Sequence, residues 1–426
     1  MLSSLSLRAR ERERERERDR GMASGLRMDQ ETAQELVKKG ATLLLLDVPQ
    51  FTLFGIDTQM FSVGPNFKGI KMIPPGPHFV CYSSANKEGN EFSPTIGFFI
   101  TTSYSEVVVR RWHCQDERLV KISEDEECRY SKAVKHLEFD NQLGPYALDH
   151  FVEWKRLSGY ITNTAIERLE PIGGDITIAC ESGLIQDVPR TAMEKQLIEQ
   201  LNISKFSRTT PEDSPRQKCY YTKIPQIVKR KDISGEELTA MNLDKTQLLE
   251  TILLKDFKGA ENLLLAELQF AFVAFMMGQS LQAFLQWKTL VSLFLCCTEA
   301  PLRTRSQLFS KFIEVIYWQL KHGFQKQKST TAAEGKGISV FLDDAWFSKD
   351  IFLYRLCKDF FLLVLQSPVI DGDLLTWTRK LKGLLEDIFG WDFEESALDV
   401  MCEDGDEYAP VVVPPDEAMP VEDQAN

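Results

Sequence analysis

A four-residue break with the sequence PPGP, residues 74–77, separates two short apolar runs at residues 70–73 and 78–82. Proline fixes φ and removes an amide donor, while glycine admits positive φ, so the break predicts two strands joined by a stiff turn. We expect a rigid sheet edge with a shaped loop, which suits contact with another macromolecule better than catalysis. Three glycines punctuate the approach to this break: Gly55, Gly64 and Gly69.

The residues around this break, 28–185, predict a first domain that mixes strands and helices. A short amphipathic helix at residues 30–39 ends at Gly40, and residues 41–48 form a continuous apolar run of strand length. Further strands are predicted from β-branched and aromatic runs at residues 95–102 and 107–112. After Glu124 the periodicity becomes helical. We therefore expect an α+β domain built on an antiparallel sheet or a small sandwich.

A long uncharged run between Glu267 and Lys288 has the length of a membrane span. Burying its amide side chains in lipid would cost about 1–3 kcal/mol each. We therefore predict a buried helical hairpin, broken at residues 278–280, and no membrane segment. This hairpin belongs to an all-α domain over residues 243–395, with a polar loop at residues 321–337. The polar residues of the run are Gln269, Gln279, Ser280, Gln282 and Gln286.

Two segments outside these domains lack a core-forming pattern. Residues 1–27 contain alternating arginine and acidic residues and are predicted to be disordered. Residues 186–242 lack sustained periodicity and are predicted to be a flexible linker. Within the linker, Thr210 and Ser214 each precede proline, so both are candidate phosphorylation sites, the alternative being loop chemistry alone. The start of translation stays open among three methionines: Met1, Met22 and Met28.

The C-terminal tail, residues 396–426, contains nine acidic residues and no lysine or arginine, so it carries −9 of the net charge of −13. Such an acidic chain is not expected to bind nucleic acid nonspecifically. One apolar island, YAPVVV at residues 408–413, interrupts the tail and is followed by two prolines. Consecutive valines favour an extended strand that can add to an exposed sheet edge. The alternative is that the valines pack back onto the helical domain. The predicted partner-binding residues are Tyr408, Val411, Val412 and Val413.

Residues with catalytic potential are few and scattered. Nine cysteines without a CxxC pair indicate reduced thiols, and the five histidines form neither HxxxH nor HExxH. We expect no metal, no cofactor and no enzymatic activity. The alternative is a hydrolase of unrecognised type that uses a histidine of the first domain, either His78 or His113, although adjacent His113 and Cys114 would point to opposite faces of a strand.

Three stretches together resemble one known family. They are residues 55–84, residues 266–295 (AELQFAFVAFMMGQSLQAFLQWKTLVSLFL), and WDFEE at residues 391–395 together with the YAPVVV island. The sequences of these stretches are similar to those of the A-one cistron splicing factor (Aar-two) family, whose members assist assembly of the U-five small nuclear ribonucleoprotein. The resemblance covers most of residues 28–415.

The resemblance implies a non-enzymatic pre-mRNA splicing factor. It would bind the RNase H-like and Jab/MPN-type domains of the scaffold protein Prp-eight, with the tail strand bridging them. It would exclude the Brr-two helicase until the particle matures. We also expect a monomer when unbound, found in cytoplasm and nucleus. The extension at residues 8–20, the linker and the loop after Lys321 depart from the family, which leaves the arrangement of the two domains open.

Overall fold

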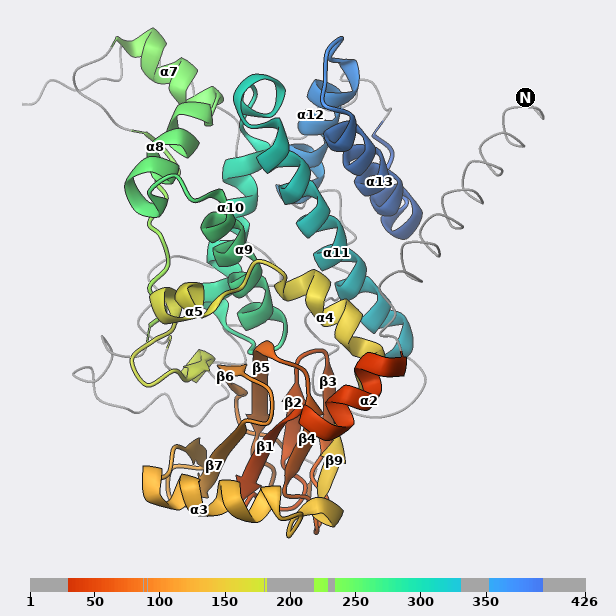
Figure 1. The fold of residues 1–426 in the computed structure, drawn as a ribbon. Helices are drawn as coiled ribbons and strands as arrows, with labels where there is room; N and C mark the ends of the chain where they lie inside the picture. Colours follow the sequence, from red (N-terminus) through yellow and green to blue (C-terminus); the bar gives the residue numbers. More distant parts are fainter. Residues whose placement is uncertain are drawn as a thin grey trace, which may run out of the picture.

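The computed structural model describes residues 30–86, 88–89, 91–179, 181, 218–228, 234–330 and 352–393. Figure 1 shows the strands gathered at one end of the molecule and the long C-terminal helices at the other. The strands are β1 (Ala41–Leu46), β2 (Leu53–Ile56), β3 (Gln59–Ser62), β4 (Gly69–Ile73), β5 (Gly76–Ser83), β6 (Ile96–Thr102), β7 (Val107–His113), β8 (Arg118–Val120), β9 (Leu143–Pro145) and β10 (Ile176–Thr177). The helices are α2 (Gln30–Lys39), α3 (Glu124–Lys135), α4 (Phe151–Ser158), α5 (Asn163–Leu169), α7 (Gly235–Leu243), α8 (Thr246–Phe257), α9 (Glu261–Met276), α10 (Leu281–Leu295), α11 (Ser306–Thr330), α12 (Phe352–Gln366) and α13 (Gly372–Phe389).

The strands form a sandwich of two five-stranded sheets, one of the two arrangements expected from the sequence. The strand orders are β8-β7-β1-β4-β9 and β10-β6-β5-β2-β3. Leu43, Phe54, Val80 and Phe98 belong to the buried core between the sheets. The second sheet is antiparallel throughout. The first is mixed, because β1 runs parallel to β7 and β4 runs parallel to β9, so the expected antiparallel pairing holds throughout only in the second sheet.

Strand β1 is buried on both of its faces, which explains its continuous apolar sequence. Leu43 and Leu45 point into the core between the sheets. Leu44 and Leu46 instead contact the cluster formed with Val134 of α3. A strand covered on both sides cannot alternate apolar with polar residues. Helix α3 thus covers the outer face of the first sheet, as Figure 1 shows.

The PPGP break connects the two sheets. It joins β4 of the first sheet to β5 of the second, and each of these strands has a hydrogen-bonded neighbour on both sides. The prediction of two strands joined by a stiff turn is confirmed. The prediction that they form a sheet edge is wrong, because the chain crosses between layers at the break and does not return as a hairpin.

The C-terminal part is helical, and its first long pair is the predicted buried hairpin. Helix α9 and helix α10 pack against each other and are separated at residues 277–280. Among the described helices, none is long and apolar enough by itself to cross a membrane; the pair α8 and α9, bent by 93° at its break, passes a test of length and composition only. Buried Phe270, Phe275 and Phe294 place α9 and α10 in the core of the protein.

Two predicted boundaries differ from the structure. Helix α11 extends to Thr330, so the first part of the predicted polar loop at residues 321–337 is helical. Helix α7 begins at Gly235, inside the predicted linker. The described residues 218–228 of that linker include Cys219 and Thr222, whose side chains are buried.

The two parts of the molecule share one hydrophobic core. Phe79 and Phe99 point from the second sheet towards the helices, and the ring of Phe99 stacks on Phe270 of α9 with centroids 4.6 Å apart. Trp154 of α4 and Leu169 of α5 lie in the same cluster. Figure 1 shows α4 and α5, in yellow, between the strands and the C-terminal helices. The layers are therefore α3, first sheet, second sheet and helical part.

Each polar residue of the uncharged run holds a hydrogen bond to a segment outside its hairpin. Gln269 accepts from the Tyr160 backbone N–H at 2.7 Å, and Gln279 accepts from the Thr95 hydroxyl at 3.0 Å. Ser280 donates to Glu181 at 2.6 Å. Gln282 and Gln286 bond Cys219 and Thr222 respectively. These residues therefore join the helical part to the sandwich and to the connecting segment.

Candidate functional site

The predicted partner-binding and modification residues lie outside the described part of the chain. This applies to the tail residues Tyr408, Val411, Val412 and Val413, and to Thr210 and Ser214 of the linker. Their predicted roles stay predictions. The last described residues include buried Trp391 and Phe393, which pack against Tyr354 of α12.

His78 is fully buried and has a structural environment. Its Nδ1 lies 2.7 Å from Oδ2 of Asp57, and its Nε2 lies 2.7 Å from the carbonyl oxygen of Pro74. Asp57 also accepts from the Tyr146 hydroxyl at 2.6 Å and from the Phe79 backbone N–H at 3.0 Å. Burial and the nearby Asp57 raise the pKa of Tyr146 above its ordinary value. This cluster fixes the PPGP break against β2 and β9.

His113 lies apart from this cluster, at the end of β7 in the other sheet. Its side chain is 45% exposed and its Nδ1 lies 3.1 Å from Asp116. The structure therefore does not bring His78 and His113 together in a pocket. Burial raises the pKa of the Cys297 thiol, as expected for a small core residue. Among the described residues, no group of three or more histidine, cysteine or acidic side chains is placed to hold a metal ion.

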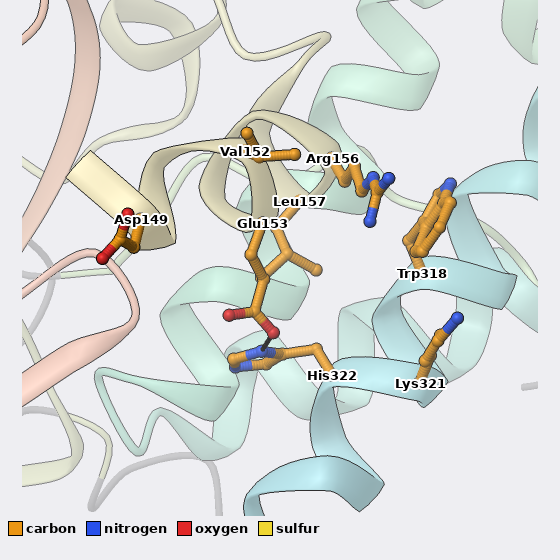
Figure 2. A pocket seen from close by; sticks show the side chains of 8 residues that line it. All are labelled: Asp149, Val152, Glu153, Arg156, Leu157, Trp318, Lys321 and His322. Carbon is orange, nitrogen blue, oxygen red and sulfur yellow. Dashed lines mark hydrogen bonds and ion pairs between the residues drawn. The ribbon is translucent and has the colours of Figure 1, made fainter. Parts of the chain in front are cut away.

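A recess of about 290 Å³ opens between α4 and α11, where the sandwich side of the molecule meets the helical part. Figure 2 shows Arg156, Trp318 and Lys321 together on one side of it and Asp149 on the other. Its lining residues are Asp149, Val152, Glu153, Arg156, Leu157, Trp318, Lys321 and His322. Charged side chains of both signs with an aromatic ring make it suitable for a polar or charged segment of a polypeptide.

His322 is the most constrained polar residue of this recess. It is 6% exposed, and its Nδ1 lies 2.6 Å from Oε1 of Glu153. Within the described part of the chain, its Nε2 is buried without a hydrogen-bond partner. Buried polar atoms in proteins are nearly always bonded. The unbonded Nε2 atom therefore marks a position where a hydrogen bond from or to a ligand group or a water molecule would be stabilising.

Aromatic rings and cations continue from this recess across α11 to α13. The guanidinium of Arg156 lies 3.7 Å from the Trp318 ring centroid, and Lys321 Nζ lies 5.0 Å from the same centroid. Trp377 lies 6.4 Å from Trp318, and Lys380 Nζ lies 4.5 Å from the Trp377 centroid. All five side chains are partly exposed. We call Arg156, Trp318, Lys321, Trp377 and Lys380 the cation–aromatic face.

A second recess, of about 300 Å³, lies at one open side of the sandwich. It is bordered by β3 and β9, which are the edge strands of the two sheets. Its lining is mainly apolar: Ile56, Gln59, Phe61, Phe67, Ile70, Gly144, Pro145 and Tyr146. Edge strands present backbone groups that can pair with an added strand. This side, and not the PPGP break, provides the sheet edge that the sequence led us to expect.

Sequence reasoning did not identify either recess. Glu153 and His322 are 169 residues apart, so their contact depends on the packing of α4 against α11. A weak signal was present in α11, because Trp318 and Lys321 lie three residues apart and so share one face of a helix. That pattern alone does not separate a binding face from a solvated surface.

Comparison with known proteins gives one consistent result. Residues 39–171 match the family model described as the AAR2 N-terminal domain, and residues 221–394 match the model described as the AAR2 C-terminal repeat region. A human protein named "Protein AAR2 homolog" is 31% identical over 92% of this chain and 97% of its own length. A homologue from Caenorhabditis elegans is 30% identical over 87% of this chain and 99% of its own. The A1 cistron-splicing factor AAR2 of Saccharomyces cerevisiae is 23% identical over 66% of this chain and 76% of its own.

Proposed function

Because the chain belongs to the AAR2 family, we propose that it is a non-enzymatic pre-mRNA splicing factor that assists assembly of the U-five small nuclear ribonucleoprotein. The observation that carries this proposal is the family match, which spans both parts of the chain. The partner in the proposal is Prp-eight, bound through its RNase H-like and Jab/MPN-type domains. The bound factor keeps the Brr-two helicase off Prp-eight until the particle matures, and the protein acts in the cytoplasm and the nucleus.

The shared core supports this role, because a factor that holds two domains of one partner needs binding faces at a fixed separation. Phe99 stacks on Phe270 across the boundary between the two parts. Gln269 bonds both the Tyr160 N–H and the Arg156 carbonyl, and Gln279 bonds Thr95. Relative motion of the parts would break buried hydrogen bonds, each of which costs about 1–3 kcal/mol when a group is left unsatisfied. The molecule can thus present its faces as one body.

The tail supplies the second element of the proposal. In an extended strand Val411 and Val413 project to one face and Val412 to the other, so the island can pair its backbone while filling pockets on both sides. Tyr408 would anchor the start of this strand. The acidic flanks favour a basic partner surface and speed the encounter with it. The same charge makes direct binding of nucleic acid unfavourable.

Control by phosphorylation is part of the proposal. Thr210 and Ser214 lie in a connection whose two described ends are both bound near the N-terminus of α10. Glu181 accepts from Ser280 and from the Gln282 N–H, and the Cys219 N–H donates to Gln282. Phosphate at Thr210 or Ser214 would add a charge of about −1.5 to −2 each. The added negative charge would weaken binding of this acidic chain to an acidic partner surface. It would strengthen binding to a basic partner surface.

Exclusion of the helicase gives a direct test. A complex of the full chain with the Jab/MPN-type fragment of Prp-eight is challenged with increasing amounts of Brr-two, and bound Brr-two is measured. The proposal predicts that the chain raises the amount of Brr-two needed for half-maximal binding, and that the variant Val412→Asp does so less. Unchanged Brr-two binding at saturating amounts of the chain would refute this part of the proposal.

A further inference from the structure

The cation–aromatic face is the most distinctive surface that the proposed function does not use. It combines three cationic groups with two tryptophan rings that are partly exposed to solvent. Arginine and lysine stacked on tryptophan keep their charge directed outwards and bind carboxylates as well as flat apolar groups. The recess between α4 and α11 continues this face, with the buried Nε2 of His322 inside it.

We propose that this face binds the acidic C-terminal tail of the same chain, residues 396–426. The inference goes beyond the proposed function, because it concerns the state of the tail before any partner is met. The tail carries nine acidic residues and no basic residue, which is the charge opposite to that of Arg156, Lys321 and Lys380. Carboxylates of the tail pair with these cations.

The reach of the chain allows this contact. The described residues end at Phe393, just after α13 ends at Phe389. Trp377 lies twelve residues before Phe389 on this helix, which corresponds to about 18 Å. The ten residues from Phe393 to Glu403 span up to about 33 Å when extended. The acidic cluster that begins at Glu403 can therefore return along α13 to Trp377 and Trp318.

Acidic groups also lie near the face. Glu153 is engaged by His322, and Asp149 lies at the opposite side of the recess in Figure 2. Burial raises the pKa of Glu314, whose carboxyl group lies near Arg156 and Lys380. In the free protein the tail is therefore bound to this face. A partner that pairs with Val411–Val413 has to displace the tail from it.

The test couples carboxylates to lysines in the full-length chain with a zero-length carbodiimide reagent, followed by mass spectrometry. Heavy- and light-isotope copies are mixed first, so that links within one chain are separated from links between chains. We expect links from residues 403–407 to Lys321 and Lys380 within one chain, several-fold more frequent than links to exposed Lys132 of α3. High salt should reduce the links, because exposed ion pairs are screened.

Matched variants keep the test independent of folding. Arg156→Glu reverses one charge of the face but keeps both lysines available for coupling, so it should lower tail links to Lys321 and Lys380 several-fold, while Lys132→Glu should leave them unchanged. Links spread evenly over exposed lysines, or found only between different copies, would overturn the proposal. Neither result bears on binding to Prp-eight, which is measured separately.

Discussion

The imidazole of His78 and the carboxyl group of Asp57 share one proton inside the N-terminal sandwich, with Nδ1 and Oδ2 2.7 Å apart. The carbonyl of Pro74 can only accept, so Nε2 of His78 must carry a proton for its 2.7 Å contact there. The remaining proton lies between Nδ1 and Oδ2. His78 therefore has both nitrogens engaged and is fully buried, which is the arrangement of a structural residue rather than of a general base.

Removal of either partner of this pair should destabilise the protein strongly. We expect His78→Ala and Asp57→Ala each to lower the free energy of unfolding by about 3–5 kcal/mol, because the other group stays buried without its partner. The double variant should lose less than the sum. His113→Ala, at an exposed ion pair, should change it by less than about 0.5 kcal/mol. Urea denaturation measures all four; an additive double variant would contradict the shared proton.

Two glycines of the segment before the PPGP break should respond very differently to alanine. Gly69 has a φ of +138°, and a Cβ there would lie 2.0 Å from the Leu43 carbonyl oxygen. We expect Gly69→Ala to cost about 2–4 kcal/mol from backbone strain and overpacking. A Cβ at Gly64 would meet nothing within 4 Å, so Gly64→Ala should be neutral to within about 0.5 kcal/mol. Equal unfolding midpoints for the two variants would be inconsistent with this close approach of β4 to β1.

The amide of Gln269 should couple the two parts of the molecule. Gln269→Ala leaves the Tyr160 N–H and the Arg156 carbonyl without their bonds, so we expect a loss of about 1–3 kcal/mol for each group that stays unsatisfied. Gln247→Ala on the exposed side of α8 is the matched control and should have little effect. Because the core is shared, fluorescence and far-ultraviolet circular dichroism should report one transition in the unaltered chain. Two separated transitions would mean that the parts unfold independently.

Glu181 should make the protein less stable as the pH rises towards neutrality. Burial raises its pKa to about 7, from an ordinary 4.5. Between these values the folded state binds more protons than the unfolded state, so stability falls with increasing pH. The stabilisation present below pH 4.5 is lost by about pH 7, roughly 2–3 kcal/mol for this group. Burial raises the pKa of Asp175 in the same direction, to about 6.

The measurement is the free energy of unfolding of the full chain from pH 4.5 to 8, compared with Glu181→Gln. We expect a shallower fall for the glutamine variant, since it cannot ionise. Identical slopes for the two proteins would show that Glu181 does not titrate with a raised pKa. Glu88→Gln, at an exposed position, serves as the control and should keep the slope of the unaltered chain.

Local patterns in the sequence predicted the elements better than their partners. The apolar run of β1 identified a strand, and its lack of alternation is explained by cover on both faces. Its parallel pairing with β7 depends on contacts between residues more than sixty positions apart, such as Leu43 and Val108, and no local pattern encodes these. The amides of the uncharged run predicted a buried helical hairpin, and α9 and α10 form one. That these amides bond the sandwich could not be predicted, because their partners lie far away in the chain.

For the candidate sites, sequence and structure each identified one that the other did not. Composition predicted the tail island around Val412 without any structure, and its role stays a prediction because it lies outside the described residues. The recess at Glu153 and His322 exists only once α4 packs on α11. Its chemistry belongs to two helices that the sequence places in different predicted domains.

The most direct test of the account is the affinity of the purified chain for the RNase H-like and Jab/MPN-type fragments of Prp-eight, alone and together. The full chain is compared with a chain that ends at Glu395. We predict that the full chain forms a complex with both fragments at once, and that truncation weakens this ternary complex more than binding to the RNase H-like fragment alone. Absence of binding to either fragment by the full chain would contradict the central claim.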